Sequence, residues 1–282
     1  MKQFFRRSLE RLAPRTYIAL SAARSRAHSQ RLLRAWGLRV LNQRLIAEIG
    51  NAVVAGPFEG LRIPLIAQAE HVGPFLLGTY ETELHAWWQR LLREEFAQML
   101  DVGSKFGFYA VAYAKRFPSA DVVAFDPDPW ARRATQATAR INHTRNVRIE
   151  SLCDPEWLET NLRPNAFVMS DCEGYEAHLF CSRLIPALAS ATMLIELHDI
   201  QAPGVTMCVQ AAFRETHSAN VLPSVTETPR TVKPIGSLTA EEMLQLTREI
   251  RGPQAWILLR PRHPVEPQGL RGAKSSAATW RR

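Results

Sequence analysis

The chain has 282 residues, 46% hydrophobic and 22% charged, which is ordinary globular usage and excludes a disordered, collagen-like or coiled-coil chain. No run of about 20 consecutive apolar residues is present, so no membrane-spanning helix is predicted. The positive net charge of +8 comes from the two ends of the chain: residues 1–48 carry 11 basic and 2 acidic side chains, and residues 260–282 carry 6 basic and 1 acidic. Residues 49–259 carry 18 basic and 24 acidic side chains, and this acidic body disfavours nucleic acid as its partner.

The first 50 residues are predicted to form a basic helical extension. Leucines recur between arginines, and Pro14 interrupts the first helical piece. The charged start lacks the apolar run of a secretory signal, although the segment resembles a mitochondrial presequence. Two further interpretations stay open: the leucines pack on the main domain, or the arginine-rich face makes a peripheral contact with a membrane or a protein partner. The apolar positions behind this prediction are Phe4, Phe5, Leu9, Leu12, Leu32, Leu33, Leu38 and Leu41.

Residues 52–66 and 82–94 are predicted to form a β-hairpin and a helix. In the first segment, Gly-Pro and Glu-Gly turn pairs separate two short apolar runs. In the second, four apolar residues, among them Trp87 and Trp88, recur at i, i+3, i+4 and i+7. We therefore expect the paired tryptophans in the core rather than in a platform that stacks nucleic-acid bases.

From residue 97 onward, strands and helices alternate, which predicts parallel βαβ units. Asp128 and Pro129 are residue types preferred at the N-cap and the first position of a helix. Thr239 and Glu242 form a capping-box pattern that opens a helix running to about Arg251. The predicted strands are 97–102, 121–125, 147–149, 166–170, 193–197 and 255–259, and the first helices between them are 108–116 and 129–141.

These elements predict a main domain over residues 51–259, followed by a loose basic tail over residues 260–282 that is rich in proline and glycine. The cysteines form no CxxC pair, which disfavours a zinc knuckle and a disulfide scaffold and favours the reducing cytosol, hence a cytoplasmic protein. The four cysteines are Cys153, Cys172, Cys181 and Cys208.

The segment 99–109 is the most informative one, because an apolar strand runs into a glycine turn and then into a helix. Gly103 permits a tight turn and a close approach of the backbone to a ligand, and Gly107 lets the next helix pack close. The GxxxG spacing does not match the dinucleotide fingerprint GxGxxG, and the Gly-Lys-Ser/Thr of a phosphate loop is absent. The segment indicates nucleoside binding; the alternative is an ordinary strand–helix turn.

Acidic residues end three of the predicted strands. Asp126 ends the second strand, where a carboxylate can accept hydrogen bonds from both ribose hydroxyls, while Asp128 caps the following helix. The strand 166–170 leads into Asp171-Cys172-Glu173-Gly174-Tyr175-Glu176, and the next one ends in Glu196-Leu197-His198-Asp199. Three acids within six residues exceed what one helix dipole needs, so these neighbouring strand ends predict a site.

Together, the segments Asp101–Tyr109, Phe125–Asp128, Asp171–Glu176 and Glu196–Asp199 resemble the FkbM-type family of S-adenosylmethionine-dependent methyltransferases. The segment 77–81 also resembles a stretch found in many members, so the resemblance covers about residues 77–200. It implies the α/β, Rossmann-like fold of class I methyltransferases, with a seven-stranded, mostly parallel sheet and helices on both faces. It also implies S-adenosylmethionine as cofactor and O-methylation of a hydroxyl on a sugar, glycan or other small molecule.

By this resemblance, the cofactor lies over the glycine turn, with Asp126 on its ribose. The chain departs from the family at Ser104 and Lys105, where Ala-Asn is common. The serine is small, whereas the lysine either pairs with the cofactor's carboxylate or crowds the site. The residues predicted to bind the cofactor are Tyr80, Glu81, Asp101, Gly103, Ser104, Gly107, Asp126 and Asp171.

An alcohol acceptor must lose its proton, and His198 is the preferred base because an unperturbed imidazole has a pKa of about 6.5. Asp171 and Glu173 are the next candidates, and this interpretation needs no metal. An alternative is that Asp171, Asp199 and His198 hold a divalent cation. Two rival functions also stay open: an RNA methyltransferase that uses the basic N-terminal segment, and a non-catalytic binding module on the same fold.

Overall fold

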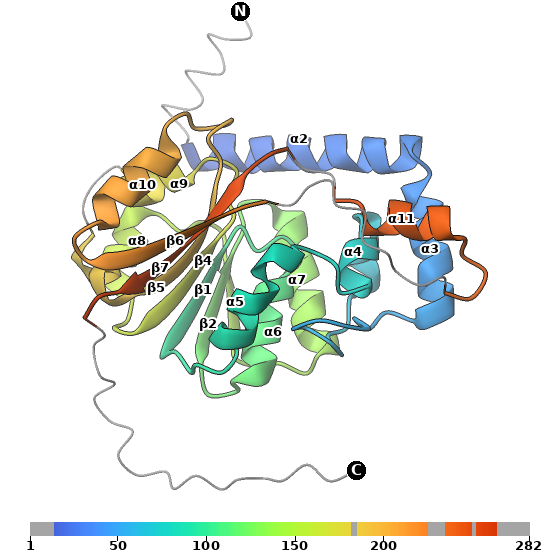
Figure 1. The fold of residues 1–282 in the computed structure, drawn as a ribbon, viewed down its shortest axis with the longest axis horizontal. Coiled ribbons are helices and arrows are strands. Elements are labelled where there is room, and N and C mark those ends of the chain that lie inside the picture. Colours follow the sequence, from blue (N-terminus) through green and yellow to red (C-terminus); the bar gives the residue numbers. More distant parts are fainter. Residues whose placement is uncertain (1–13, 182–184, 225–234, 250–251, 264–282) are drawn as a thin grey trace, which may run out of the picture.

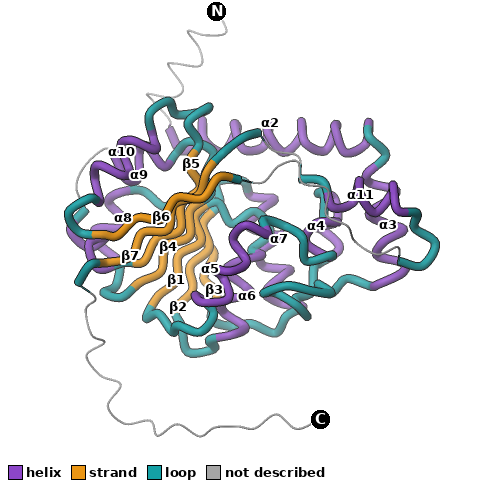
Figure 2. Tube along the Cα trace, viewed as in Figure 1, coloured by secondary structure: helices purple, strands orange, loops and turns teal. Residues whose placement is uncertain are grey.

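The computed structural model describes residues 14–181, 185–224, 235–249 and 252–263, and it shows a seven-stranded sheet between two layers of helices (Figure 1, Figure 2). The strand order is β3-β2-β1-β4-β5-β7-β6. The first five strands in the chain are parallel, and β7 runs antiparallel to both of its neighbours. The strands are β1 (Gln98–Val102), β2 (Asp121–Phe125), β3 (Val147–Glu150), β4 (Ala166–Ser170), β5 (Thr192–Leu197), β6 (His217–Pro223) and β7 (Ala255–Pro261). The expected class I methyltransferase fold is confirmed.

The central strands are buried on both faces, which explains why they read as continuous apolar runs rather than as alternating ones. Successive residues of one strand belong to different cores: Met99 packs in one cluster and Leu100 in the other. The helices α5 (His85–Leu91), α6 (Phe108–Arg116) and α7 (Pro129–Ile141) contribute to the first cluster, and α8 (Pro155–Asn161), α9 (Glu176–Cys181) and α10 (Val205–Phe213) to the second.

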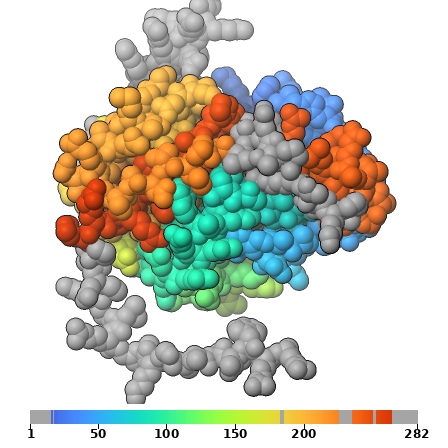
Figure 3. Space-filling view, in the orientation of Figure 1, coloured from blue at the N-terminus to red at the C-terminus, as the bar shows by residue number. Residues whose placement is uncertain are grey.

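The N-terminal segment is part of the first core. Helices α2 (Pro14–Ala35) and α3 (Leu38–Ile49) contribute buried leucines to it, which confirms the interpretation that these leucines pack on the main domain. Helix α2 runs along the top of the view, and α3 packs against α11 (Ala240–Thr247), whose surface adjoins it in the space-filling view (Figure 3). The buried leucines are Leu33, Leu38, Leu41 and Leu45. No helix in the described ranges has the length and hydropathy needed to cross a bilayer.

Most predicted elements are confirmed within one or two residues, and both predicted helix caps form. The Asp128 carboxylate accepts a hydrogen bond from the Trp130 amide at the start of α7. The capping box of Thr239 and Glu242 opens α11, which ends four residues before Arg251. Trp87 and Trp88 are buried, as expected.

Three expectations are corrected. The hairpin predicted over residues 52–66 is shorter than expected: its two sides pair antiparallel through one bridge, between Ala52 and Arg62, and through flanking backbone hydrogen bonds. Its last residues instead begin the 3-10 helix η1 (Leu65–Ala69). The predicted tail begins later than residue 260, because β7 runs to Pro261. The rest of the tail, beyond residue 263, lies outside the described residues. The N-terminal positions Phe4, Phe5, Leu9 and Leu12 also lie outside them. A disulfide joins Cys181 and Cys208, because α9 and α10 pack side by side although the cysteines lie 27 residues apart.

Candidate functional site

The predicted site residues gather where the strand order reverses. The chain passes from β1 outward to β2 and β3 and then returns to β4 on the other side of β1. In such sheets, ligands bind outside the carboxyl ends of the strands at this switch point. Gly103 follows β1 and Asp171 follows β4, and the Asp171 amide donates a hydrogen bond to the Val102 carbonyl at 2.9 Å.

The two glycines of the turn allow close packing within the protein. Gly103 has φ +90°, and a Cβ there would lie 1.7 Å from the Asp171 carbonyl oxygen. The turn therefore needs glycine for the approach of two protein loops, and not only for space near a ligand. Gly107 has φ +74°, and a Cβ there would lie 2.6 Å from Cγ2 of Thr135. The helix that this glycine lets pack close is therefore α7, and not the next helix, α6, which it precedes.

The two positions that depart from the family pattern behave differently. Ser104 is 5% exposed, and its buried hydroxyl has no hydrogen-bond partner among the described residues. A buried hydroxyl without a partner costs about 1–3 kcal/mol, so this atom is suited to a ligand. Lys105 is half-exposed, and its Nζ lies 3.9 Å from a carboxylate oxygen of Glu70.

Asp126 lies beside this turn at the end of β2, as expected. Its side chain is not free: one carboxylate oxygen accepts from the Lys105 amide at 2.9 Å and the other from the Asp128 amide at 2.8 Å. Each oxygen keeps a second lone pair. Burial raises the pKa of Asp126 to about 6, because it outweighs the two amide hydrogen bonds, which lower the pKa.

Asp101 is more deeply placed. Its side chain, on β1, is 3% exposed, and its carboxylate accepts a hydrogen bond from the Ala110 amide at 3.0 Å. Burial raises its pKa to about 7; the Ala110 hydrogen bond opposes this shift, and the charges of Asp171 and Asp126 add to it. Asp101 therefore links β1 to the start of α6, inside the protein.

Tyr80 and Glu81 lie in the loop after helix α4 (Gly73–Leu76), and Glu81 contacts the start of α6. The Tyr109 hydroxyl, in the first turn of α6, donates a hydrogen bond to the buried Glu81 carboxylate. The Glu81 backbone has φ +46°, a conformation uncommon outside glycine, and its amide donates to Glu249. The Tyr80 ring stacks on Phe75 with 3.8 Å between ring centroids. These residues therefore lie next to the glycine turn.

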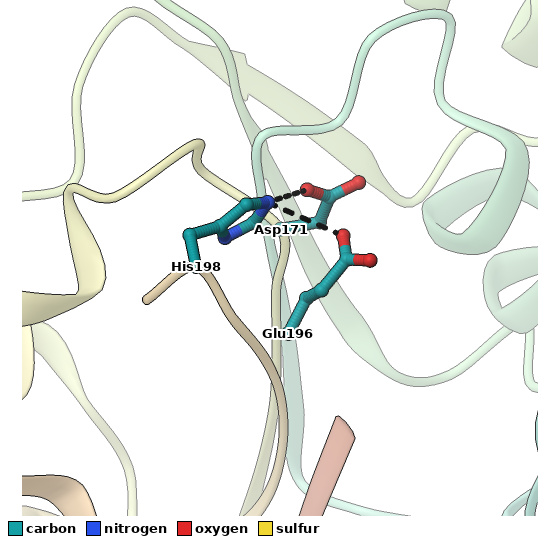
Figure 4. Close-up of side chains that lie close together, drawn as sticks. All are labelled: Asp171, Glu196 and His198. Carbon is teal, nitrogen blue, oxygen red and sulfur yellow. Dashed lines mark ion pairs between the residues drawn. The ribbon is translucent and has the colours of Figure 1, made fainter. Parts of the chain in front are cut away.

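His198 is the centre of the acidic cluster. Its side chain is buried, and Nδ1 lies 2.8 Å from Oε1 of Glu176 at the start of α9. Nε2 lies 3.5 Å from Oδ1 of Asp171, 3.5 Å from Oε2 of Glu196 and 3.9 Å from Oε2 of Glu173. Figure 4 shows the imidazole with this nitrogen facing Asp171 and Glu196.

The surrounding acids decide the charge of His198. Burial lowers the pKa of the imidazole, but the hydrogen bond to Glu176 and the charges of Asp171, Glu176 and Glu173 raise it to about 9. Burial raises the pKa of Glu176, yet the hydrogen bond and the charge of His198 outweigh it, so that this pKa is lowered. At neutral pH, in the protein alone, the pair is therefore an imidazolium and a carboxylate.

Two further acids at these strand ends lie at the surface. Glu173 is exposed, and its carboxylate accepts a hydrogen bond from Gln201 at 3.2 Å. Asp199 is exposed and accepts hydrogen bonds from the Gly204 and Thr206 amides and from the Thr206 hydroxyl at the start of α10. The structure therefore brings Asp171 and His198 together but turns Asp199 away, and Glu196 lies beside them instead.

Glu176 and Glu196 were not among the residues predicted to act in catalysis or binding. A signal for Glu196 was available, because residues two apart near a strand end point to the same side, and Glu196 and His198 are two apart. The contact of Glu176 with His198 joins positions 22 residues apart and depends on how α9 packs.

A groove lined by Gln136, Arg140 and neighbouring residues lies on α7 and β3, away from the strand ends that carry the site.

No protein-family model and no curated protein matches this sequence. Among solved structures, the chain is similar to precorrin-6y C5,15-methyltransferase from Geobacter metallireducens, at 14% identity and a TM-score of 0.43 over 63% of this chain and 87% of that one. It is also similar to an rRNA methylase from Streptococcus thermophilus, at 12% identity and a TM-score of 0.43 over 63% of this chain and 95% of that one. A third similar structure is the O-methyltransferase TomG from Streptomyces achromogenes in complex with SAM, at 12% identity and a TM-score of 0.40 over 61% of this chain and 77% of that one. Similarities this low carry neither a reaction nor a substrate to this chain.

Proposed function

We propose that this protein is an S-adenosylmethionine-dependent methyltransferase whose acceptor is a hydroxyl group of a sugar, glycan or other small molecule. The supporting observation is the arrangement at the switch point: a glycine turn after β1, the buried carboxylate of Asp126 beside it, and the acidic cluster after β4 and β5. A nucleoside cofactor and a second reactant would meet between these two groups.

The residues present fit this cofactor. In the part of the chain that the structure describes, the buried Ser104 hydroxyl has no hydrogen-bond partner, and each Asp126 oxygen retains a lone pair for a ribose hydroxyl. Gly103 and Gly107 shape the turn that holds both residues in place. The proposed cofactor-binding residues beyond these four are Tyr80, Glu81, Asp101 and Asp171.

S-adenosylmethionine supplies a methyl group on a sulfonium: the S–C bond breaks, its electron pair stays on sulfur, and a C–O bond forms to the acceptor. The chain must hold the acceptor oxygen about 3–3.5 Å from that carbon and remove the hydroxyl proton. We assign to Glu173 the role of the base that accepts the hydroxyl proton, because its exposed carboxylate lies at the edge of the cluster. We assign to Asp171 the role of orienting the acceptor. His198 faces inward between Asp171 and Glu196, so we assign it the role of holding them.

Calorimetric titration of the full chain with S-adenosylmethionine tests the proposal. Wild-type protein should bind one equivalent, and Asp126→Ala should weaken the dissociation constant about 10- to 100-fold, because a charged hydrogen-bond acceptor is lost. The control is Asp121→Asn, which removes an acid from the opposite end of the same strand and should bind as wild type.

Two outcomes would refute the proposal. A folded wild-type chain that does not bind the cofactor would remove its basis, and unchanged affinity in folded Asp126→Ala would remove the ribose assignment. The acceptor class is tested with methyl-labelled cofactor: label recovered in RNA, and not in small hydroxyl compounds, would overturn that part.

A further inference from the structure

Three side chains converge at the carboxyl ends of β4 and β5. Asp171, Glu196 and His198 each offer one potential ligand atom, and these atoms all lie within 4.8 Å of one another. The Nε2 atom of His198 lies 3.5 Å from an oxygen of each acid (Figure 4). Metal–ligand bonds of about 2.1 Å place neighbouring ligands about 3 Å apart, so only a small contraction would bring the three atoms around one ion.

A second observation concerns the histidine alone. The His198 side chain is 1% exposed, and its Nε2 is a buried atom that makes no hydrogen bond to any residue that the structure describes. The other ring nitrogen is fixed by Glu176 at 2.8 Å, and this contact aims Nε2 between the two acids. Metal-binding histidines are oriented in this way, with one ring nitrogen on a carboxylate and the other on the ion.

We propose that Asp171, Glu196 and His198 bind a divalent cation. With the histidine neutral, the two carboxylates balance the charge of one such ion. Imidazole favours zinc and iron, whereas carboxylates favour magnesium and manganese, so a mixed set suits Mn²⁺ and Zn²⁺ better than Ca²⁺. Three protein ligands leave coordination positions open for a small molecule.

The position of the site suggests its use, and this step rests on the proposed function. Asp171 follows the strand beside the glycine turn, so the cation would lie next to the cofactor-binding side. A cation there would make a hydroxyl that reached it more acidic, and the proton would pass to Glu173 or to solvent. The cation site itself depends only on the three side chains.

The test uses the full chain, treated with EDTA, exchanged into buffer and titrated with MnCl₂ by calorimetry and by the EPR signal of free Mn²⁺, without S-adenosylmethionine. Wild-type protein should show one saturable site per chain. Glu196→Gln and His198→Gln should weaken it at least about tenfold, and ZnCl₂ should compete for it. The matched control is Asp199→Asn, an acid at the same strand end whose carboxylate caps α10; it should bind Mn²⁺ as wild type.

Circular dichroism and the melting temperature establish that each variant is folded. If Glu196→Gln does not fold, Asp171→Asn takes its place, because this side chain is partly exposed. The inference is overturned if wild-type protein shows no saturable site, since the His198 imidazolium then balances the acids by itself. It is also overturned if the folded ligand variants bind like wild type, or if Asp199→Asn loses binding equally.

A parallel titration with S-adenosylmethionine in EDTA separates the two proposals. Cofactor binding without Mn²⁺ binding leaves the proposed function standing and removes the cation. Mn²⁺ binding without cofactor binding retains the site and removes the methyltransferase role.

Discussion

Replacing Asp101 with Asn should stabilise the protein above pH 7 but not below pH 4. The carboxyl group is 3% exposed, and burial raises its pKa to about 7, with the charges of Asp171 and Asp126 adding to the shift. An unfolded chain returns this group to a pKa of about 3.9. Between these values the folded protein binds more protons than the unfolded chain, so its free energy of unfolding falls as the pH rises.

The size of the effect follows from the two pKa values. A difference of about three units corresponds to on the order of 4 kcal/mol once the pH exceeds 7. Asn keeps an oxygen for the Ala110 amide, but it adds an NH₂ group that needs a partner, at a cost of about 1–3 kcal/mol. The expected net gain at pH 8 is therefore about 1–3 kcal/mol.

Urea unfolding at pH 5 and pH 8, in EDTA and without cofactor, measures this gain. The difference in the free energy of unfolding between Asp101→Asn and wild type should be more favourable to the variant at pH 8 than at pH 5. Asp121→Asn, which removes a partly exposed acid from the neighbouring strand, controls for the change in net charge and should show no comparable gain. If the difference between Asp101→Asn and wild type is the same at both pH values, the reasoning about the buried carboxyl is wrong.

Further predictions concern the glycine turn, the N-terminal helix and Asp126, the acid proposed to bind the ribose. Gly103→Ala should abolish soluble expression, because the added Cβ would overlap the Asp171 carbonyl oxygen. The control is Gly60→Ala, at φ +77° with no atom within 4 Å of the added Cβ, which should lower the free energy of unfolding by only about 1 kcal/mol. Equal loss of soluble protein in the two variants would contradict this reasoning. Arg26→Ala should lower stability by about 1 kcal/mol in urea unfolding, because the 2.6 Å ion pair with Asp128 is lost; unchanged stability would show that the pair contributes nothing. Cofactor affinity should fall below about pH 6, as Asp126 takes up a proton, and an affinity flat from pH 5 to 8 would refute its role.

Much of the fold was predictable because its signals are local. The strands β1, β2, β4 and β5 are apolar runs bounded by polar residues, and Asp128 marks the start of α7 within one residue. Strand β6 was missed because it lies at the sheet edge, where exposed residues dilute the apolar pattern and a proline ends it. The N-terminal leucines signalled packing, but not which helix they meet.

The site was predictable only in part. That the acids after β2, β4 and β5 share one edge with the glycine turn after β1 follows from parallel topology. Whether a given acid faces its neighbours depends on loop geometry: Asp199 turns to cap α10, whereas Glu196 points to His198. The charge of His198 could not be read from its residue type either, because it depends on Glu176, which the packing of α9 brings into contact.

The insertion of β7 between β5 and β6 has a consequence for how this protein folds during synthesis. Strand β7 leaves the ribosome after the six other described strands, yet it carries Trp256, which is fully buried, and pairs with both neighbours. Until it emerges, β5 and β6 have no partner along the edges that β7 will occupy, and unpaired edges invite aggregation. Nascent chains stalled before residue 255 should therefore be protease-sensitive around β5, and release of the last strand should protect them.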